Sequence, residues 1–365
     1  MSPASAYAPG RVELLGNHTD YNQGVVLAAA IDRGLTMAGI SRRDDNIILT
    51  SRSAGSRVHA TLRNIYVMEE TPWANYALGV VEQFIRAGLV MRGFDAEVTG
   101  DVPLGAGLSS SAAFEVATAG LLMKLHEVRL GPMDVAKLCQ RAENDFVGVR
   151  SGLLDQVTSV FGKADHLVYL DCQSEEVRTI AFPKGYSLVI AESGVKHSLI
   201  GSLYNTRREE TAAAAEALGA ETLRDVSPDH LEITRESVDE ILWRRAAHVV
   251  GENDRVWRAV NALESQDVAT LGQLMNASHE SSRVNFENST PELDDLVTIA
   301  RSLPGVLGSR LTGGGFGGAT VTLATADEAQ RVAEEIRNRY AADHDHAPNT
   351  FVCQIADGAA VLWRQ

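Results

Sequence analysis

The glycines of this 365-residue chain are unevenly placed, and two short clusters of them constrain its fold more than any other feature. The first segment runs from Gly100 to Gly107 and the second from Gly313 to Gly318. Glycine adopts backbone conformations that other residues avoid and lets the backbone approach a ligand closely. Both segments lie beside sequences typical of regular structure. We therefore expect two tight loops joined directly to strands and helices.

The residues around these loops predict a mixture of strands and helices. A strand over 94–102 leads through the first loop into a helix, because small and apolar residues recur at helical spacing from Ala113. An apolar stripe over 135–146 indicates a second helix, and a Thr-Ala-Asp-Glu capping box at Thr325 indicates a third. Further strands are expected over 166–170, 187–191 and 320–324. Since helices and strands mix in both halves, the fold class is α+β.

Length, charge and cysteine content narrow the class of protein. A chain of 365 residues exceeds what one core usually supports, so we expect two domains. The net charge of −15 disfavours nucleic-acid and membrane partners. The three cysteines match neither a disulfide framework nor a zinc site. The first residues resemble no targeting signal, and no apolar run reaches the length of a membrane span. A cytoplasmic location follows from these features.

The first loop, Pro103 to Ala113, has the composition of a phosphate cradle. Its glycines allow close backbone approach, its serines add hydroxyl donors, and the first turn of the next helix presents unpaired N–H groups. The Gly-Lys-Ser/Thr ending of a Walker loop is absent, and so is the dinucleotide fingerprint. A plain turn before a helix has a similar composition, so the loop alone does not decide the function.

Two other segments suit ligand binding. Thr312 to Gly318 holds five glycines in seven residues, which favours a tight backbone approach over a simple β-turn with a bulge. The run from Gly10 to Asn22 gathers Arg, Asn, His, Thr, Asp and Tyr between apolar segments. Such side chains hydrogen-bond hydroxyl-rich ligands, although a polar surface loop has the same composition.

Taken in order, the three segments resemble those of the galactokinases within the GHMP kinase superfamily. The serine-rich loop resembles the superfamily's Pro-x-x-x-Gly-Leu-Ser-Ser-Ser-Ala motif, whereas the His-Thr-Asp-Tyr-Asn run marks the galactokinase branch. The likeness extends over nearly the whole chain, with further matches at Trp73-Ala-Asn-Tyr76, Gly152-Leu-Leu-Asp155-Gln156, Asp171-Cys172 and Ser202 to Arg208.

The resemblance implies a fold and an activity. Residues 1–175 would form an N-terminal ATP- and sugar-binding domain, which is ribosomal protein S5 domain 2-like. Residues 176–365 would form a ferredoxin-like C-terminal GHMP domain, with the site in the cleft between the two. Family members use ATP and Mg²⁺ to phosphorylate the anomeric C1 hydroxyl of α-D-galactose, which gives galactose 1-phosphate and ADP. The partners would be small molecules, the sugar and ATP.

The resemblance also implies roles for individual residues. Asp155 matches the catalytic aspartate, and Arg11 the arginine that contacts it and the transferring phosphoryl group. Ser111 and Glu143 match the magnesium ligands. Residues implied to bind ATP are Trp73, Tyr76, Gly105, Ala106, Gly107, Leu108, Ser109, Ser110 and Ser111. Residues implied to bind the sugar are Asn17, His18, Asp20, Gly152 and Tyr204.

The chain departs from the family pattern at Asn17, where galactokinases typically carry a glutamate that contacts the sugar's 6-hydroxyl. A neutral amide accepts a weaker hydrogen bond than a carboxylate does. It also lacks the negative charge with which a glutamate would repel a carboxylate at C6 of the sugar. Kinases for galacturonate, arabinose or N-acetylgalactosamine are therefore alternatives to galactokinase. A non-catalytic sugar sensor is a further alternative, but the serine loop, Asp155, Arg11 and Glu143 are all intact.

Overall fold

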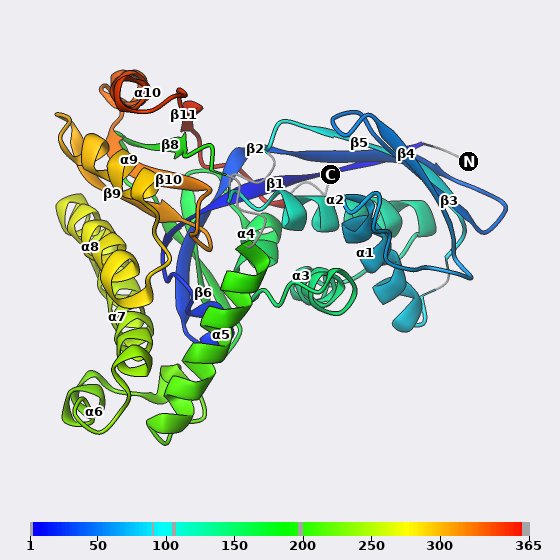
Figure 1. Cartoon of the computed structure of the whole chain (residues 1–365). Helices are drawn as coiled ribbons and strands as arrows, with labels where there is room; N and C mark the ends of the chain where they lie inside the picture. The colour runs from blue at the N-terminus through cyan, green and yellow to red at the C-terminus, as the bar shows by residue number, and fades with distance from the viewer. Residues whose placement is uncertain (1–2, 90, 104–106, 196–199, 360–365) are drawn as a thin grey trace.

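The computed structural model describes residues 3–89, 91–103, 107–195 and 200–359, which form two β-sheets flanked by helices (Figure 1). The larger sheet has seven strands in the order β4-β3-β5-β2-β6-β7, with β1 paired along β2. Only β3 and β5 pair in parallel. Its strands are β1 (Ala4–Leu15), β2 (Val25–Ser41), β3 (Asn46–Ser51), β4 (Ser56–Thr61), β5 (Phe94–Gly100), β6 (His166–Asp171) and β7 (Glu176–Ala181).

One face of the larger sheet packs against the helices of the N-terminal half. Val26 and Ala28 of β2 point into this core, while their neighbours Leu27 and Ala29 point into a second core on the opposite face. This alternation follows from the two-residue period of a strand. The helices on the first face are α1 (Ala74–Arg86), α2 (Ser110–His126), α3 (Pro132–Arg141) and α4 (Leu154–Phe161).

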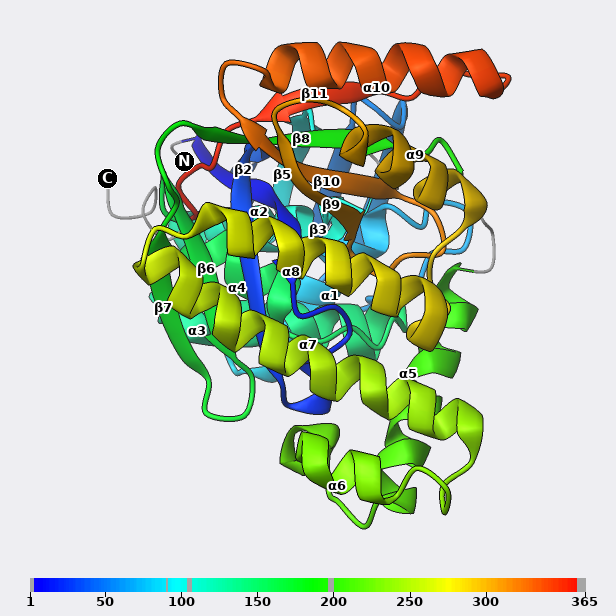
Figure 2. The same cartoon turned by 90° about the vertical axis from the view of Figure 1, so that its left-hand side faces the viewer.

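The smaller sheet has four antiparallel strands in the order β11-β8-β10-β9. They are β8 (Tyr186–Glu192), β9 (Val306–Thr312), β10 (Ala319–Thr325) and β11 (Thr350–Cys353). Helices α9 (Pro291–Arg301) and α10 (Ala329–Asp343) cover one face. Helix α8 (Val268–Ser281) covers the other, and α7 (Glu240–Glu264) runs beside α8 (Figure 2). Helices α5 (Ile200–Ala217) and α6 (Pro228–Ile233) pack with α7 in a separate core.

The second core joins the two halves of the molecule. It combines apolar residues of β1 and β2 with residues of β8, β10, α7 and α8. Strand β7 lies beyond residue 175, yet it pairs with β6 in the larger sheet. The larger sheet therefore continues to Ala181, and the division at 175/176 stays a prediction.

The α+β class is confirmed, and each predicted strand is present. The predicted helix start at Thr325 is wrong, because Thr325 is the last residue of β10 and pairs with Tyr186. The chain turns over 326–328, and α10 begins only at Ala329. The apolar stripe over 135–146 begins in α3, but a π-helical turn (Ala142–Val147) continues it. Such turns widen a helix and often occur at functional sites.

Candidate active site

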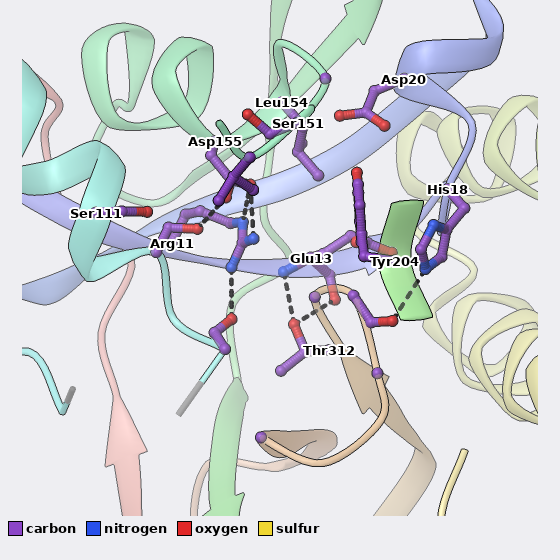
Figure 3. A pocket seen from close by; sticks show the side chains of 18 of the residues that line it. Arg11, Glu13, His18, Asp20, Ser111, Ser151, Leu154, Asp155, Tyr204 and Thr312 are labelled. Atoms are coloured by element: carbon purple, nitrogen blue, oxygen red, sulfur yellow. Dashed lines mark hydrogen bonds and ion pairs between the residues drawn. The ribbon is translucent and has the colours of Figure 1, made fainter. Parts of the chain in front are cut away.

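A pocket of about 360 Å³ lies where β1, the serine loop before α2, the start of α4, helix α5 and the loop between β9 and β10 meet (Figure 3). Val12 and Leu14 of β1 are buried in the second core. Because side chains alternate along a strand, Arg11 and Glu13 point the other way, and both line the pocket.

An ion pair between Arg11 and Asp155 lies in this pocket. The Arg11 guanidinium donates to Asp155 Oδ1 from Nε at 2.7 Å and approaches it through Nη2 at 2.6 Å, and Nη1 donates to the Gly107 carbonyl at 2.6 Å. The Ser109 hydroxyl donates to the other carboxylate oxygen. The side chain of Arg11 is only 6% exposed and that of Asp155 is 22% exposed. Residues 144 positions apart in the chain thus form one charged centre open to the pocket.

Glu143 lies in the same pocket, on the π-helical turn. It is buried, and it accepts hydrogen bonds from Ser151 and from Gln156 Nε2 at 3.0 Å. Burial raises the pKa of the Glu143 carboxyl above its ordinary value, although these hydrogen bonds oppose the rise. A carboxylate and a hydroxyl facing one pocket are the hard oxygen donors that Mg²⁺ prefers.

The opposite end of the pocket holds His18, Asp20 and Tyr204 (Figure 3). His18 Nε2 lies 2.9 Å from the Gly314 carbonyl and Nδ1 lies 2.7 Å from the Tyr21 hydroxyl. Burial lowers the pKa of His18 to about 4, so the ring is neutral near pH 7. A carbonyl can only accept, so Nε2 carries the proton and the Tyr21 hydroxyl donates to Nδ1. Burial, with the nearby Asp155 charge, raises the pKa of Asp20 to about 7.

Gly152 leaves space for Asp20. A Cβ atom at residue 152 would lie 1.9 Å from Asp20 Oδ2, so no larger residue fits without moving the carboxylate. The second glycine loop is equally tight. Gly315 has a φ of +77°, and a Cβ there would lie 2.2 Å from the Asn288 carbonyl. The predicted tight backbone approach in this loop is confirmed.

Asn17 lines the pocket but is already hydrogen-bonded to the protein. Its amide donates to the Gly313 carbonyl at 2.7 Å and accepts from Asn288 Nδ2 at 2.8 Å. Sequence reasoning missed its neighbour Glu13, whose carboxyl is 3.4 Å from the Asn17 amide and pairs with Arg310 at 2.9 Å. The alternation of polar and apolar residues over Arg11-Val12-Glu13-Leu14, which is typical of a strand, is the signal that could have identified it.

Most predicted site residues meet in this one pocket. Those lining it are Arg11, Asn17, His18, Asp20, Tyr76, Gly107, Ser109, Ser110, Ser111, Glu143, Gly152, Asp155 and Tyr204. Leu108 is buried in the second core, although its carbonyl accepts from the Arg11 N–H at 3.1 Å. Trp73 stacks on Phe114 and donates from its indole nitrogen to Ser56. Gly105 and Ala106 lie outside the described residues.

Three family models match the chain. The galactokinase galactose-binding signature matches residues 2–40, the GHMP kinase N-terminal domain residues 75–163 and the GHMP kinase C-terminal domain residues 259–342. The galactokinase of Roseiflexus sp. (strain RS-1) is 42% identical over 362 residues, which cover 96% of this chain and 91% of the relative. The chain belongs to the galactokinase family. The human galactokinase is also 42% identical, over 97% of this chain and 91% of its own length.

Solved structures agree with this membership. The Lactococcus lactis galactokinase complexed with galactose superimposes with a TM-score of 0.94 at 31% identity, over 98% of this chain and 94% of that one. The Methanococcus jannaschii mevalonate kinase has a TM-score of 0.68 at 20% identity, over 98% of this chain and 99% of that one, which shows a shared fold alone. This galactokinase family member is therefore an enzyme of the phosphotransferase class, and its family uses ATP. None of the helices in the described part of the chain combines the length and apolar sequence of a membrane span.

Proposed function

We propose that this protein transfers the γ-phosphoryl group of ATP to the C1 hydroxyl of α-D-galactose, which yields galactose 1-phosphate and ADP. The observation that carries the proposal is the Arg11–Asp155 pair, which lies in one pocket with the serine-rich loop and the residues of the galactose-binding signature. The match to a galactokinase that holds galactose supports the choice of sugar.

Asp155 accepts a hydrogen bond from the C1 hydroxyl of the sugar and orients it toward the γ-phosphorus. The C1 oxygen then forms a bond to phosphorus and gives its proton to Asp155, while the bond between phosphorus and the ADP oxygen breaks. Arg11 pairs with Asp155 at 2.6 Å and offsets negative charge on the phosphoryl oxygens. Phosphoryl transfer requires positioning and charge stabilisation more than covalent chemistry, and this pair supplies both.

Ser111 and Glu143 would hold Mg²⁺. Both line the pocket. One carboxylate and one hydroxyl fit Mg²⁺, which usually binds one or two protein groups and completes its shell with phosphate and water. When bound, the ion neutralises charge on the β- and γ-phosphates.

The nucleotide would lie along the serine loop. The backbone of this loop would wrap the phosphates, because the start of α2 presents free N–H groups there. The residues concerned are Gly105, Ala106, Gly107, Leu108, Ser109, Ser110 and Ser111. Tyr76 lines the pocket and would contact adenine. Trp73 would complete the adenine site from its place against Phe114.

The sugar would lie at the end of the pocket formed by Asn17, His18, Asp20, Gly152 and Tyr204. Asp20 accepts hydrogen bonds from sugar hydroxyls, and the ring of Tyr204 provides an apolar surface for the sugar. All three cysteines carry free thiols, which supports a cytoplasmic location.

A sugar panel tests the proposal. Galactose, galacturonate, arabinose and N-acetylgalactosamine are each incubated with ATP and Mg²⁺, ADP release is measured, and the phosphorylated carbon is identified by ³¹P NMR. We expect the highest kcat/KM with galactose and phosphate on C1. A better substrate among the other three would identify a different sugar kinase, and ATP and sugar binding without turnover would indicate a sensor.

A further inference from the structure

Glu13 is a charged residue of the pocket that the mechanism above does not use. It follows Arg11 by two residues on β1, so the two side chains lie on one face about 6.6 Å apart along the strand. Arg11 marks the end where C1 reacts. In Figure 3, Glu13 lies between Arg11 and the pair His18 and Tyr204, on the sugar side of the pocket.

The Asn17 amide, by contrast, already makes hydrogen bonds to other groups of the protein. Its oxygen accepts from Asn288 at 2.8 Å and from Ser282 at 3.4 Å, and its nitrogen donates to the Gly313 carbonyl at 2.7 Å. The remaining N–H points to Glu13 Oε2 at 3.4 Å. Asn17 and Glu13 are both buried, at 1% and 3% exposed, but a sugar hydroxyl that bound Asn17 would have to displace one of these bonds.

The Glu13 carboxyl retains free capacity to accept hydrogen bonds. Arg310 Nη1 donates to Oε1 at 2.9 Å, and the long contact from Asn17 is the one bond to Oε2 among the described residues. A carboxylate has about four acceptor positions, so Oε2 can accept a ligand hydroxyl without breaking its ion pair. Burial raises the pKa of Glu13, while the Arg310 and Arg11 guanidinium groups oppose that rise and the Glu252 carboxylate adds to it.

We propose that Glu13, and not Asn17, is the carboxylate that accepts a sugar hydroxyl remote from C1, and that it excludes sugars with a carboxylate there. The negative charge that position 17 lacks is present at position 13, within hydrogen-bond reach of the same amide. Arg310 is fully buried and does not line the pocket, so an incoming anion meets Glu13 first. Asn17 instead binds the second glycine loop through Gly313 and accepts from Asn288. This inference rests on the proposed function.

The test pairs protein variants with sugar variants. The native protein, Glu13→Gln and the matched control Asn17→Ala are assayed with galactose and its 2-, 3-, 4- and 6-deoxy forms. Affinities are also measured by calorimetry in the presence of a non-hydrolysable ATP analogue. Such cycles isolate the energy shared by two contacting groups.

We expect Glu13→Gln to lower kcat/KM and affinity for galactose about tenfold, the size of a charge-assisted hydrogen bond. For one deoxy sugar, the same substitution should cost almost nothing, because the hydroxyl that Glu13 binds is already missing. Asn17→Ala should show no such coupling with any sugar. Galacturonate should be a poor substrate of the native protein and improve relative to galactose in Glu13→Gln.

Glu13→Gln leaves Arg310 without its charged partner. Glu13→Asp is therefore made in parallel, because it retains the negative charge. Far-UV circular dichroism checks that each variant is folded. Coupling at Asn17, coupling at neither residue, or galacturonate turnover equal to that of galactose in the native protein would overturn the inference. The galacturonate comparison needs no variant at all. Native protein that does not phosphorylate galactose refutes the proposed function itself, whereas turnover without Glu13 coupling refutes only this inference.

Discussion

Asp155→Asn is the most informative single substitution in the pocket. The amide keeps the size of the carboxyl but removes its charge. In the native protein, Asp155 accepts from Arg11 Nε at 2.7 Å and from Ser109. The variant leaves the Arg11 guanidinium, 6% exposed, without a counter-charge.

The expected loss of stability follows from that geometry. A hydrogen bond to a charged group contributes about 1.5–3 kcal/mol. Breaking a fully buried ion pair costs about 3–5 kcal/mol. Because Asp155 is 22% exposed, water in the pocket solvates part of the orphaned charge, so the lower range applies. We therefore expect the free energy of unfolding to fall by about 1.5–3 kcal/mol.

The expected loss of activity is larger. A positioned group that accepts a proton or orients a nucleophile typically contributes 10²- to 10⁴-fold, so kcat should fall by about 10²-fold or more. Affinity for ATP should stay near the native value, because Asp155 faces the sugar. The assays are urea unfolding, ADP release and calorimetric titration with the ATP analogue.

Asp95→Asn is the matched control, since it removes the same charge from an exposed pair with Arg57 at 3.5 Å. It should change stability by less than about 1 kcal/mol and leave kcat unaltered. Turnover of Asp155→Asn close to that of the native enzyme would refute the catalytic assignment. A large loss of ATP affinity would refute the placement of Asp155 beside the sugar.

Three further predictions concern the same pocket. The pKa of Asp20 is about 7 in the folded protein against an ordinary 3.8, so Asp20 stabilises the fold only while protonated, and this contribution is lost as the pH rises through that window. Urea unfolding should show Asp20→Asn gaining stability relative to the native protein between about pH 4 and 7, and a constant difference would contradict the shift. Ser111→Ala should raise the Mg²⁺ concentration needed for half-maximal activity, with partial rescue at high Mg²⁺; an unchanged Mg²⁺ titration would remove Ser111 from the metal site. Gly152→Ala should raise the KM for galactose more than that for ATP, because its Cβ would lie 1.9 Å from Asp20 Oδ2, and equal effects on both would argue against a sugar contact there.

The sequence alone determined what depends on contiguous residues. The serine loop before α2 and the run from Gly10 to Asn22 are local motifs, so their spacing identified the family and most pocket residues. The apolar periodicity likewise predicted the strands and three of the helices, the third with its start too early, because helix and strand periods are set by local backbone geometry.

Other features depend on contacts between distant segments. The capping box at Thr325 does not start a helix, because Thr325 pairs with Tyr186 of β8 instead. Strand pairing provides backbone hydrogen bonds that an isolated helical turn would not. Trp73 and Leu108 belong to matching motifs, yet neither lines this pocket, because Trp73 stacks on Phe114 at the edge of the core and Leu108 is buried in the second core.

The position of the charges was also decided by tertiary structure. Arg11 meets Asp155 across 144 residues, and Glu13 meets Arg310 across 297. The sequence shows only that residue 17 is a neutral asparagine where the family typically has a glutamate. In the fold, the Asn17 amide is hydrogen-bonded to Gly313 and Asn288, and the nearby carboxylate is that of Glu13. Hydrogen-bonding capacity depends on which groups a side chain already satisfies, and only the packed structure fixes those partners.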